Sequence, residues 1–406
     1  MGDRAYDLIL FGATGFTGRL VAEYLARRVA GTPLRWALAG RSQSKLEAVR
    51  RDLVAIDPAT AQLPLVIVDA MDPTATAALA RTTTVVCTTV GPYQRYGAAL
   101  VAGCADAGTA YCDLTGEVPF VRASIDAHHE RAIATGARIL HCCGFDSVPS
   151  DLGVWLLQRE LTARTGRGAA SVLAGFQLRG AASGGTIASM LELSAAARRD
   201  RAVRKLLLDP YALDPAGTPR GDDRDRHGVR YEAELGAYTA PFVMAAVNAR
   251  VVRRSHALRG QPWGRAWRYD EVMITGPGVR GVAGAAAITG ALAGFFGALQ
   301  VGPLRGLIEK RLPKPGDGPS AEQRRRGRYR TRLVGTVDGV RAEATFADSL
   351  DPGYDGTAKL LGEAALALAL DPPLGGGGVL TPSVALGDHL LPRLRAAGVT
   401  LDVSIG

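Results

Sequence analysis

A glycine-rich turn near the N-terminus constrains the fold of this chain more than any other feature. Gly12, Gly15 and Gly18 lie between an apolar run, Tyr6–Phe11, and an amphipathic stretch, Phe16–Val29. In such a turn the first glycine permits the tight bend, the second lets the main chain approach a pyrophosphate, and the third lets helix and strand pack closely. The helix N-terminus adds oriented N–H groups for an anion. We therefore predict a dinucleotide-phosphate site formed by Gly12, Ala13, Thr14, Gly15, Phe16, Thr17 and Gly18.

The first 150 residues alternate short apolar runs with helical stretches, as βαβ units do. We expect strands at Tyr6–Phe11, Leu34–Ala39, Leu65–Val68, Val85–Val90, Tyr111–Leu114 and Arg138–Cys142. Apolar strands separated by helices indicate a parallel sheet with both faces covered. The predicted fold class is α/β, with a Rossmann-type doubly wound parallel sheet over residues 1–150.

Beyond Pro149 this alternation is lost, and long connections separate the apolar stretches. Strand-like stretches occur at 171–179, 240–254 and 330–346. They predict a mixed α+β domain over 151–350, in which the Asp-, Arg-, Pro- and Gly-rich segment 209–228 is an exposed loop. A helical segment, 351–406, is expected to follow, with helices at about 354–370 and 384–397 on either side of a glycine linker.

The tip of the second predicted strand indicates which dinucleotide binds. A site for NAD places an acidic residue there to hold the ribose 2′-hydroxyl. This chain has no acidic residue between Glu23 and Glu47, and it presents Arg41, Ser42 and Lys45 instead. Arg is suited to stacking on adenine and to pairing with a 2′-phosphate, so we predict NADP(H) as the cofactor. Asp69, at the end of the third strand, is expected near the adenine edge or as a strand cap.

The ends of the fourth and sixth predicted strands indicate where the chemistry takes place. Val90, Gly91 and Pro92 follow strand four, where such folds place the nicotinamide ribose. Tyr93 then follows as a candidate acid, and Asp146 and Ser147 lie after strand six as further catalytic candidates. We expect Asp146 to orient the site rather than to donate a proton, unless burial raises its pKa.

Composition excludes several other functions. The formal charge is +9, but only five of the 48 basic residues are Lys and no nucleic-acid-binding motif is present. The six His show no metal-ligand spacing, so no metal is predicted, and neither a G-x-S-x-G elbow nor a Tyr-x-x-x-Lys pair occurs. The five Cys lie mostly in apolar runs and indicate buried, reduced thiols. No signal peptide precedes the first strand, which favours the cytoplasm.

One long uncharged segment requires separate interpretation. No charged residue occurs between Arg280 and Arg305, a length sufficient to cross a bilayer as a helix. Its many Gly and Ala residues make insertion weak. We favour a buried or subunit-interface role for 281–304 over a groove for an apolar acyl chain, and that groove over membrane contact. A homodimer is one possibility.

Several motifs occur together in an order that resembles the saccharopine dehydrogenase-like oxidoreductases, most closely their trans-acting enoyl reductase branch. Besides the glycine turn, they are Ala39–Arg41, Val90–Gly97, Asp113–Glu117, Cys143–Asp151, Arg250–Ser255, Leu312–Gly316 and Leu380–Pro382. The resemblance implies a Rossmann domain, a second domain with a mixed sheet, and a C-terminal segment returning to the first. It also implies activity in lipid or polyketide metabolism.

The leading interpretation is an enoyl reductase that delivers hydride to an α,β-unsaturated acyl thioester, with Tyr93 or Ser147 as hydrogen-bond donor. An acyl carrier protein, a polyketide synthase or the phosphates of CoA would then be partners for Arg253, Arg254 and the cluster Arg324–Arg332. An alternative is an amino-acid dehydrogenase that acts on a C–N bond, which requires Arg residues converging in its cleft. A third is a non-catalytic NADP-binding or lipid-associated protein.

Overall fold

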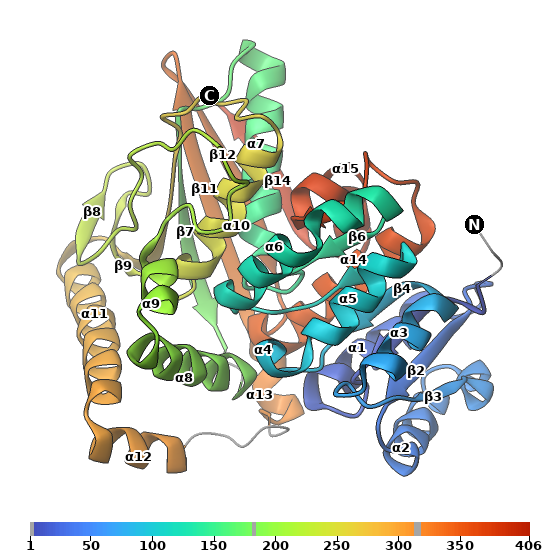
Figure 1. Cartoon of the computed structure of the whole chain (residues 1–406). Coiled ribbons are helices and arrows are strands. Elements are labelled where there is room, and N and C mark those ends of the chain that lie inside the picture. The colour runs from blue at the N-terminus through green and yellow to red at the C-terminus, as the bar shows by residue number, and fades with distance from the viewer. Residues whose placement is uncertain (1–3, 181–183, 312–317) are drawn as a thin grey trace. The chain divides into compact units, whose positions relative to one another are not determined.

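A computed structural model describes residues 4–180, 184–311 and 318–406, and these residues form two compact units (Figure 1). The first unit comprises Met1–Phe145, Gly316–Gly318 and Gly353–Ala397. The second comprises Asp146–Pro315, Pro319–Pro352 and Gly398–Gly406. The C-terminal segment, expected as one helical piece that returns to the first domain, is thus divided. Its last strand pairs in the sheet of the second unit.

The first unit contains a seven-stranded sheet in the order β13-β6-β5-β4-β1-β2-β3, with every neighbouring pair parallel. Its strands are β1 Tyr6–Phe11, β2 Trp36–Gly40, β3 Leu65–Ile67, β4 Thr83–Thr88, β5 Ala110–Cys112, β6 Arg138–Leu140 and β13 Gly378–Leu380. The predicted Rossmann-type sheet is confirmed. All residues of β2 are buried, as expected for a strand covered on both faces.

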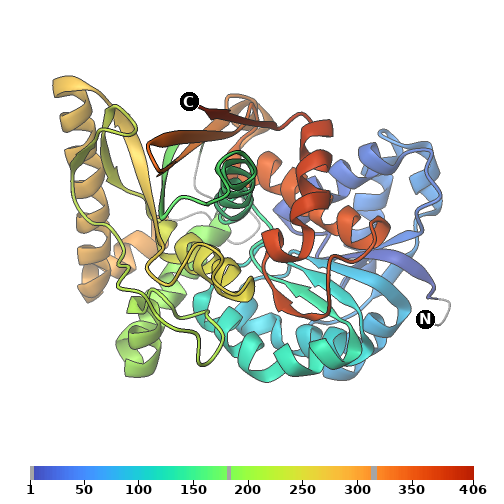
Figure 2. The ribbon, with the colours of Figure 1, turned by 90° about the horizontal axis from the view of Figure 1, so that it is seen from above.

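Helices cover both faces of this sheet (Figure 2). On one face pack α1 Phe16–Val29, α14 Thr357–Leu370 and α15 Pro382–Ala396, with α2 Gln43–Val54 beside α1. On the other face lie α3 Pro73–Thr82, α5 Ala98–Ala107 and α6 Val118–Thr135. Asp72 caps α3 by accepting hydrogen bonds from the main-chain N–H groups of Thr74 and Ala75. Gly108 and Gly136 end α5 and α6 in the left-handed conformation that glycine adopts readily.

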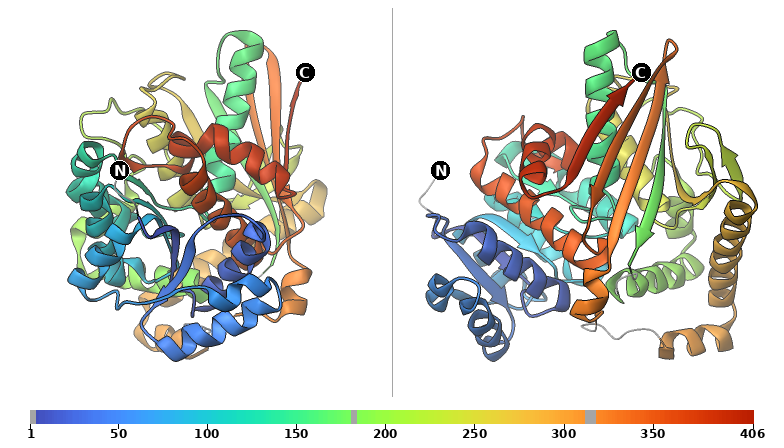
Figure 3. Two further views of the ribbon diagram at one scale, coloured as in Figure 1. Left: turned by 90° about the vertical axis from the view of Figure 1, so that its right-hand side faces the viewer. Right: turned by 180° about the vertical axis from the view of Figure 1, so that it is seen from behind.

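The second unit contains a mixed seven-stranded sheet in the order β14-β12-β11-β7-β10-β9-β8, in which only β7 and β10 are parallel neighbours (Figure 3). Its strands are β7 Ser171–Arg179, β8 Arg230–Glu232, β9 Ala237–Pro241, β10 Arg268–Gly276, β11 Arg328–Val337, β12 Val340–Asp348 and β14 Thr400–Ile405. Its helices are α7 Val148–Thr165, α8 Gly184–Arg199, α9 Arg201–Leu208, α10 Ala245–Leu258, α11 Gly278–Gln300, α12 Gly302–Arg311 and α13 Ala321–Arg325. A mixed sheet was predicted for this part of the chain, and it is confirmed.

The stretch 240–254 differs from its prediction. We expected a strand, but β9 ends at Pro241 and helix α10 follows. Its run of Val residues favours a strand by propensity. However, α10 is buried on all sides from Val247 to His256, so neither a two-residue nor a helical hydrophobic period is visible in the sequence. Tertiary packing therefore overrides the local preference here.

The stretch 330–346 is not one strand but the hairpin β11–β12. Asp338 and Gly339, both with positive φ, form its two-residue turn. An Asp-Gly pair between apolar runs is a strong hairpin signal, and it was present in the sequence. The segment 209–228 is irregular as expected, yet it is not simply exposed, because Leu213 and Asp223 are buried.

The uncharged segment departs from one part of the favoured interpretation, burial, and leaves the other part, a subunit interface, as a prediction. It forms most of helix α11, in which only Gly281, Ala285 and Leu299 are buried within the described chain. A position in the core of the described part of the chain is therefore excluded. This helix is long and apolar enough to span a membrane, with a mean hydropathy of 1.8 over its best window.

A buried carboxylate joins two helices of the first unit. Glu363 of α14 has no exposed side-chain surface, and its Oε1 accepts hydrogen bonds from the Tyr24 hydroxyl at 2.6 Å and from Arg28 Nε at 2.7 Å. Both donors lie on α1. Breaking such a contact leaves donors without a partner, so its loss costs more than the loss of an exposed pair.

We therefore expect Glu363→Ala to lower the free energy of unfolding by about 1.5–3 kcal/mol. Glu23→Ala, which removes the exposed i,i+4 pair with Arg27 on the same helix, is the matched control and should cost about 0.5 kcal/mol or less. Urea denaturation of both variants measures the difference. Equal effects would show that the buried contact contributes no more than a surface pair.

Candidate functional site

The glycine turn is closely packed at two of its three glycines. Gly12 has φ +98°, and a Cβ there would lie 2.8 Å from Thr89 Oγ1. A Cβ at Gly18 would lie 2.1 Å from the Gly12 carbonyl oxygen, so no larger residue fits without moving the helix. A Cβ at Gly15 would have its nearest heavy atom 3.5 Å away, which leaves the outer side of the turn open. The geometry is that of a turn built for close approach by a ligand.

The first turn of α1 retains the capacity to bind an anion. Its N-cap is Gly15, which supplies no side-chain cap, and no acidic residue lies in this turn. The main-chain N–H groups at the start of a helix carry partial positive charge and attract phosphate. Ala13 is buried, while Thr14 and Thr17 are partly exposed beside the turn. The Phe16 ring packs edge-on against Tyr354, at 5.0 Å between ring centres, so it fixes the helix entry.

The tip of β2 presents the predicted 2′-phosphate residues to solvent. Arg41 and Lys45 are exposed and Ser42 is partly exposed, directly after Gly40 at the carboxyl end of the strand. Asp69 is exposed and its Oδ1 accepts a hydrogen bond from the Met71 main-chain N–H at 2.9 Å. Asp69 thus caps the turn that follows β3, and its expected place near the adenine edge stays a prediction.

The segment after β4 returns to the glycine turn. The Thr89 main-chain N–H donates to the Phe11 carbonyl at 2.9 Å, and the Thr89 hydroxyl donates to the Gly12 carbonyl at 3.1 Å. Val90 follows, with Gly91 and Pro92 joined by a cis peptide bond. The strand itself ends at Thr88, two residues earlier than predicted. Val90 and Gly91 therefore border the turn on the side where such folds hold the nicotinamide ribose.

Tyr93 does not have the surroundings expected of an acid. Its side chain is 4% exposed, and its hydroxyl donates to the Thr88 carbonyl oxygen at 3.1 Å. The same hydroxyl oxygen accepts from the Leu114 main-chain N–H at 3.4 Å. Burial, followed by the nearby Asp113 charge, raises the Tyr93 pKa well above its usual value. The hydroxyl is thus committed to holding the strand ends together.

Two buried carboxylates next to Tyr93 organise the loops at this edge of the sheet. Glu117 accepts hydrogen bonds from the main-chain N–H groups of Tyr93, at 3.0 Å, and Gln94, at 2.7 Å. Asp113 accepts from the Tyr111 hydroxyl at 2.8 Å and bonds His141 Nδ1 at 2.7 Å. Its Oδ1 accepts from two main-chain N–H groups, those of Thr115 and Cys142.

Asp146 begins the second unit and retains some exposure as a residue. Its carboxyl group is nevertheless surrounded by protein, and this burial raises its pKa to about 6. No hydrogen bond or ion pair holds this carboxylate among the residues that the structure describes. The condition under which the sequence analysis allowed Asp146 to donate a proton is therefore met.

Ser147 leads into a buried polar network that the sequence analysis missed. Its hydroxyl donates to Asn248 Oδ1 at 3.1 Å, and Asn248 Nδ2 donates to Glu271 Oε2 at 3.0 Å. Ser150 and Tyr269 donate their hydroxyl protons to Glu271 Oε1, at 2.5 Å and 2.7 Å. Burial raises the pKa of Glu271 to about 7. These residues are far apart in the sequence, so no local pattern could have identified the group.

Two of the Arg residues that we expected to bind a carrier protein or CoA are buried. Arg253 and Arg254 are 3% and 1% exposed, and Arg253 Nε donates to Asp223 Oδ2 at 2.9 Å. Arg254 donates to the Leu213 carbonyl. The prediction that this pair forms a docking surface is wrong, because both side chains are buried and bound to the segment that precedes α10. Within Arg324–Arg332, Arg325, Arg328 and Arg330 remain exposed.

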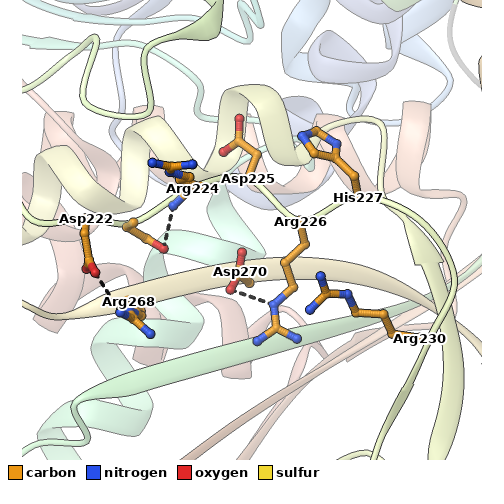
Figure 4. A pocket seen from close by; sticks show the side chains of 9 residues that line it. Asp222, Arg224, Asp225, Arg226, His227, Arg230, Arg268 and Asp270 are labelled. Carbon is orange, nitrogen blue, oxygen red and sulfur yellow. Dashed lines mark hydrogen bonds and ion pairs between the residues drawn. The ribbon is translucent and has the colours of Figure 1, made fainter.

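A pocket of about 440 Å³ lies next to this ion-pair region. It is lined by Asp222, Asp223, Arg224, Asp225, Arg226, His227, Arg230, Arg268 and Asp270. Figure 4 shows Arg226 paired with Asp270 and Arg268 paired with Asp222 across its wall, at 2.7 and 2.9 Å. A lining without an apolar side chain does not suit an acyl chain. The five Cys are all buried, as predicted, and none forms a disulfide in the described part of the chain. No cluster of three metal-ligating side chains occurs within the described ranges.

The fold and the turn together define an oxidoreductase of the Rossmann type with a dinucleotide site in its first unit. Comparison with known proteins agrees, since residues 8–140 match the saccharopine dehydrogenase NADP binding domain. A protein of Mycobacterium tuberculosis provisionally named a trans-acting enoyl reductase is 47% identical over 99% of this chain and 98% of its own length. A trans-acting enoyl reductase of Mycobacterium bovis is 44% identical over 98% of both chains.

The saccharopine dehydrogenase (L-Glu forming) of Saccharomyces cerevisiae has a similar solved structure, with a TM-score of 0.52, 14% identity and coverage of 98% of this chain and 99% of its own. At that identity the likeness concerns the fold alone. The chain belongs to the saccharopine dehydrogenase-like oxidoreductases, in the family of the trans-acting enoyl reductases. Its cofactor is NADP(H).

We expect Arg41→Ala to weaken NADPH binding by about 1.5–3 kcal/mol, the range for hydrogen bonds to charged groups, while NADH binding hardly changes. The matched control is Arg51→Ala, an exposed Arg at the other end of α2. Calorimetric titration with both cofactors measures the effect. Equal affinity of the unmodified protein for NADPH and NADH would contradict a 2′-phosphate role for Arg41.

Proposed function

We propose that this protein reduces the carbon–carbon double bond of an α,β-unsaturated acyl thioester with NADPH. The observation that carries the proposal is the near-full-length identity with proteins named trans-acting enoyl reductases. The open phosphate turn and the uncapped start of α1 are consistent with it, because they suit the pyrophosphate of the cofactor.

The proposed reaction requires two contributions from the protein. Bound NADPH supplies a hydride, which goes to the β-carbon of the substrate. The chain then has to stabilise the negative charge that develops on the thioester oxygen and to provide a proton for the α-carbon. Both groups have to lie at the carboxyl edge of the first sheet, where this fold holds the nicotinamide.

Asp146 is our candidate for the proton donor. It directly follows Phe145, the last residue of the first unit's N-terminal part, so the chain itself keeps it near the loop after β6. A carboxyl group that is enclosed by protein and has its pKa raised to about 6 is about half protonated at pH 6 and about one-tenth protonated at pH 7. A titratable group shifted by burial at such an edge is typical of functional sites.

Ser147 is our candidate for the hydrogen-bond donor to the thioester oxygen. Its hydroxyl proton is directed to Asn248 in this structure, and Asn248 is held in turn by Glu271. We regard Asn248 and Glu271 as positioning residues, because they act on Ser147. Tyr93 binds the main chain of Thr88 and Leu114 within the first unit, so we propose a structural role for it rather than that of the acid.

The amino-acid dehydrogenase alternative lacks a supporting observation. It requires Arg side chains free to bind substrate carboxylates. The three buried Arg of α10, Arg250, Arg253 and Arg254, bind Asp side chains or main-chain carbonyls of the second unit. These three guanidinium groups are therefore bound within the second unit and do not serve to bind substrate carboxylates.

The name of the relatives suggests that the acyl group is presented by another protein. We propose an acyl carrier protein, either free or part of a polyketide synthase, as the partner, acting in lipid or polyketide metabolism in the cytoplasm. Carrier proteins of this kind would have to meet basic side chains. The exposed Arg325, Arg328 and Arg330 are available for that contact.

The activity is tested by following NADPH oxidation with a panel of enoyl thioesters on CoA or on a carrier protein, and with imines formed from amino and keto acids. We expect turnover with enoyl thioesters and none with imines. Turnover with imines alone would replace the proposed reaction with amino-acid dehydrogenation. The cofactor-binding variant Arg41→Ala serves as the negative control at low NADPH concentration.

Asp146→Asn should lower turnover by roughly 10²–10⁴, the usual contribution of a general acid, while Tyr93→Phe should lower it by about tenfold or less. Only protonated Asp146 donates, so the kcat/KM of the unmodified enzyme should fall as pH rises through about 6. This limb of the profile should disappear in Asp146→Asn. A larger loss for Tyr93→Phe than for Asp146→Asn would return the acid role to Tyr93.

Unfolding provides a readout that is independent of substrate. Because the pKa of Asp146 is raised from 3.8 to about 6 in the folded state, the protein loses stability as pH rises between those values. Asp146→Asn removes that penalty. The variant should therefore be about 1–3 kcal/mol more stable than the unmodified protein at pH 8, and no more stable at pH 4.

A further inference from the structure

Helix α11 is an apolar helix on the outside of the second unit (Figure 1). It packs along β9 and β10, and the Thr275 hydroxyl donates to the Gly281 carbonyl at 2.8 Å near its start. Near its end, Arg198 of α8 donates to the Leu299 carbonyl at 2.6 Å. The helix is thus fixed to the unit at both ends. Twenty of its 23 residues nevertheless remain at least partly exposed.

The exposed part of α11 has no face suited to water. The helix contains no charged residue after Arg280, and Val279 and Phe296 are 85% and 40% exposed. Beyond the helix, Val301 and Leu304 continue the apolar surface, at 48% and 47% exposure. A surface helix of a soluble protein ordinarily carries polar residues on its outer face. A contiguous apolar surface of this kind marks a contact with another molecule or with lipid.

Basic residues are concentrated on α8 and α9, and α8 contacts the end of α11 through Arg198. Residues 184–208, which form α8 and α9, include five basic and two acidic residues, and Arg201, Arg204 and Lys205 on α9 are exposed. Residues 278–308 add two Arg and no acidic residue. Leu208, at the end of α9, is 74% exposed next to these cations. Clustered Lys and Arg beside apolar side chains are attracted to anionic lipid headgroups.

We propose that α11, with the cationic residues of α9, is a peripheral binding surface for an anionic lipid bilayer. A second copy of the chain would cover one face of α11 and leave the other apolar faces in water. The interfacial zone of a bilayer covers every outward face at once. The Gly and Ala content makes the interaction weak, so the charge of the lipid controls it. This proposal is independent of the reaction proposed above.

The test is cosedimentation of the full-length protein with vesicles of phosphatidylcholine alone or mixed with phosphatidylglycerol. We expect binding to the mixed vesicles, weakened by high salt, and little binding to phosphatidylcholine alone. Val279→Glu with Phe296→Glu should abolish it. Leu370→Glu, at a comparably exposed apolar residue of the first unit, is the matched control and should bind normally.

Charge variants test the contribution of the cationic residues of α9. Arg201→Gln with Arg204→Gln should weaken binding to anionic vesicles by about 5-fold for each charge removed, whereas Arg51→Gln with Arg81→Gln should not. Circular dichroism confirms that each variant is folded. Light scattering of the protein without vesicles tests whether a second copy of the chain covers α11 instead. A dimer that is dissociated by Val279→Glu with Phe296→Glu, without vesicle binding, would overturn the proposal, as would equal binding to neutral and anionic vesicles.

Discussion

The first unit depends on how closely its first helix approaches its first strand. A Cβ at Gly18 would lie 2.1 Å from the Gly12 carbonyl oxygen, and that oxygen also accepts the Thr89 hydroxyl. The contact joins β1, α1 and the segment after β4 at one point. Because no side chain lies between Gly12 and Gly18, helix α1 starts directly after the turn, and its first N–H groups are available to a phosphate. The packing of α1 on β1 and the binding of phosphate therefore both require glycine in this turn.

Buried charge determines much of the remaining organisation, and each unit handles it in its own way. In the first unit Asp113 and Glu117 accept main-chain N–H groups, so carboxylates hold the loops after β4, β5 and β6 in addition to the direct bond from the Cys143 N–H to the Asp113 carbonyl. In the second, Arg250 and Arg253 of α10 bind Asp225 and Asp223 of the preceding segment. A buried charge that loses its partner is strongly destabilising, so these contacts hold irregular chain in defined positions. Asp146 differs because its carboxyl is enclosed without such a partner among the described residues.

The sequence predicted the first unit well and the second only in part, since the strand expected at 171–179 is β7 but the stretch 240–254 is mostly helix. Strands covered on both faces are continuous apolar runs, so β1 and β2 were located to within two residues. Helix α10 is buried on all sides and rich in Val, which hides its period. The candidate site divides in the same way. The glycine turn is local and was visible, whereas the network of Ser147, Asn248 and Glu271 exists only through tertiary contacts.

Tyr93 and α11 both show that the sequence does not predict which groups are buried. Tyr93 is more enclosed than we expected, and α11 is less enclosed. The position of Tyr93 after β4 was predicted correctly, but its neighbours were not, and those neighbours bind its hydroxyl to the main chain. For α11 the sequence showed an apolar, uncharged segment. An uncharged segment has the same composition whether it is buried in the fold or exposed on its surface. Only the positions of β9 and β10 decide that one side of α11 is covered and the rest is not. Residue types alone indicate which chemical groups a chain carries. Whether ligands can reach those groups depends on packing between segments that are distant in the sequence.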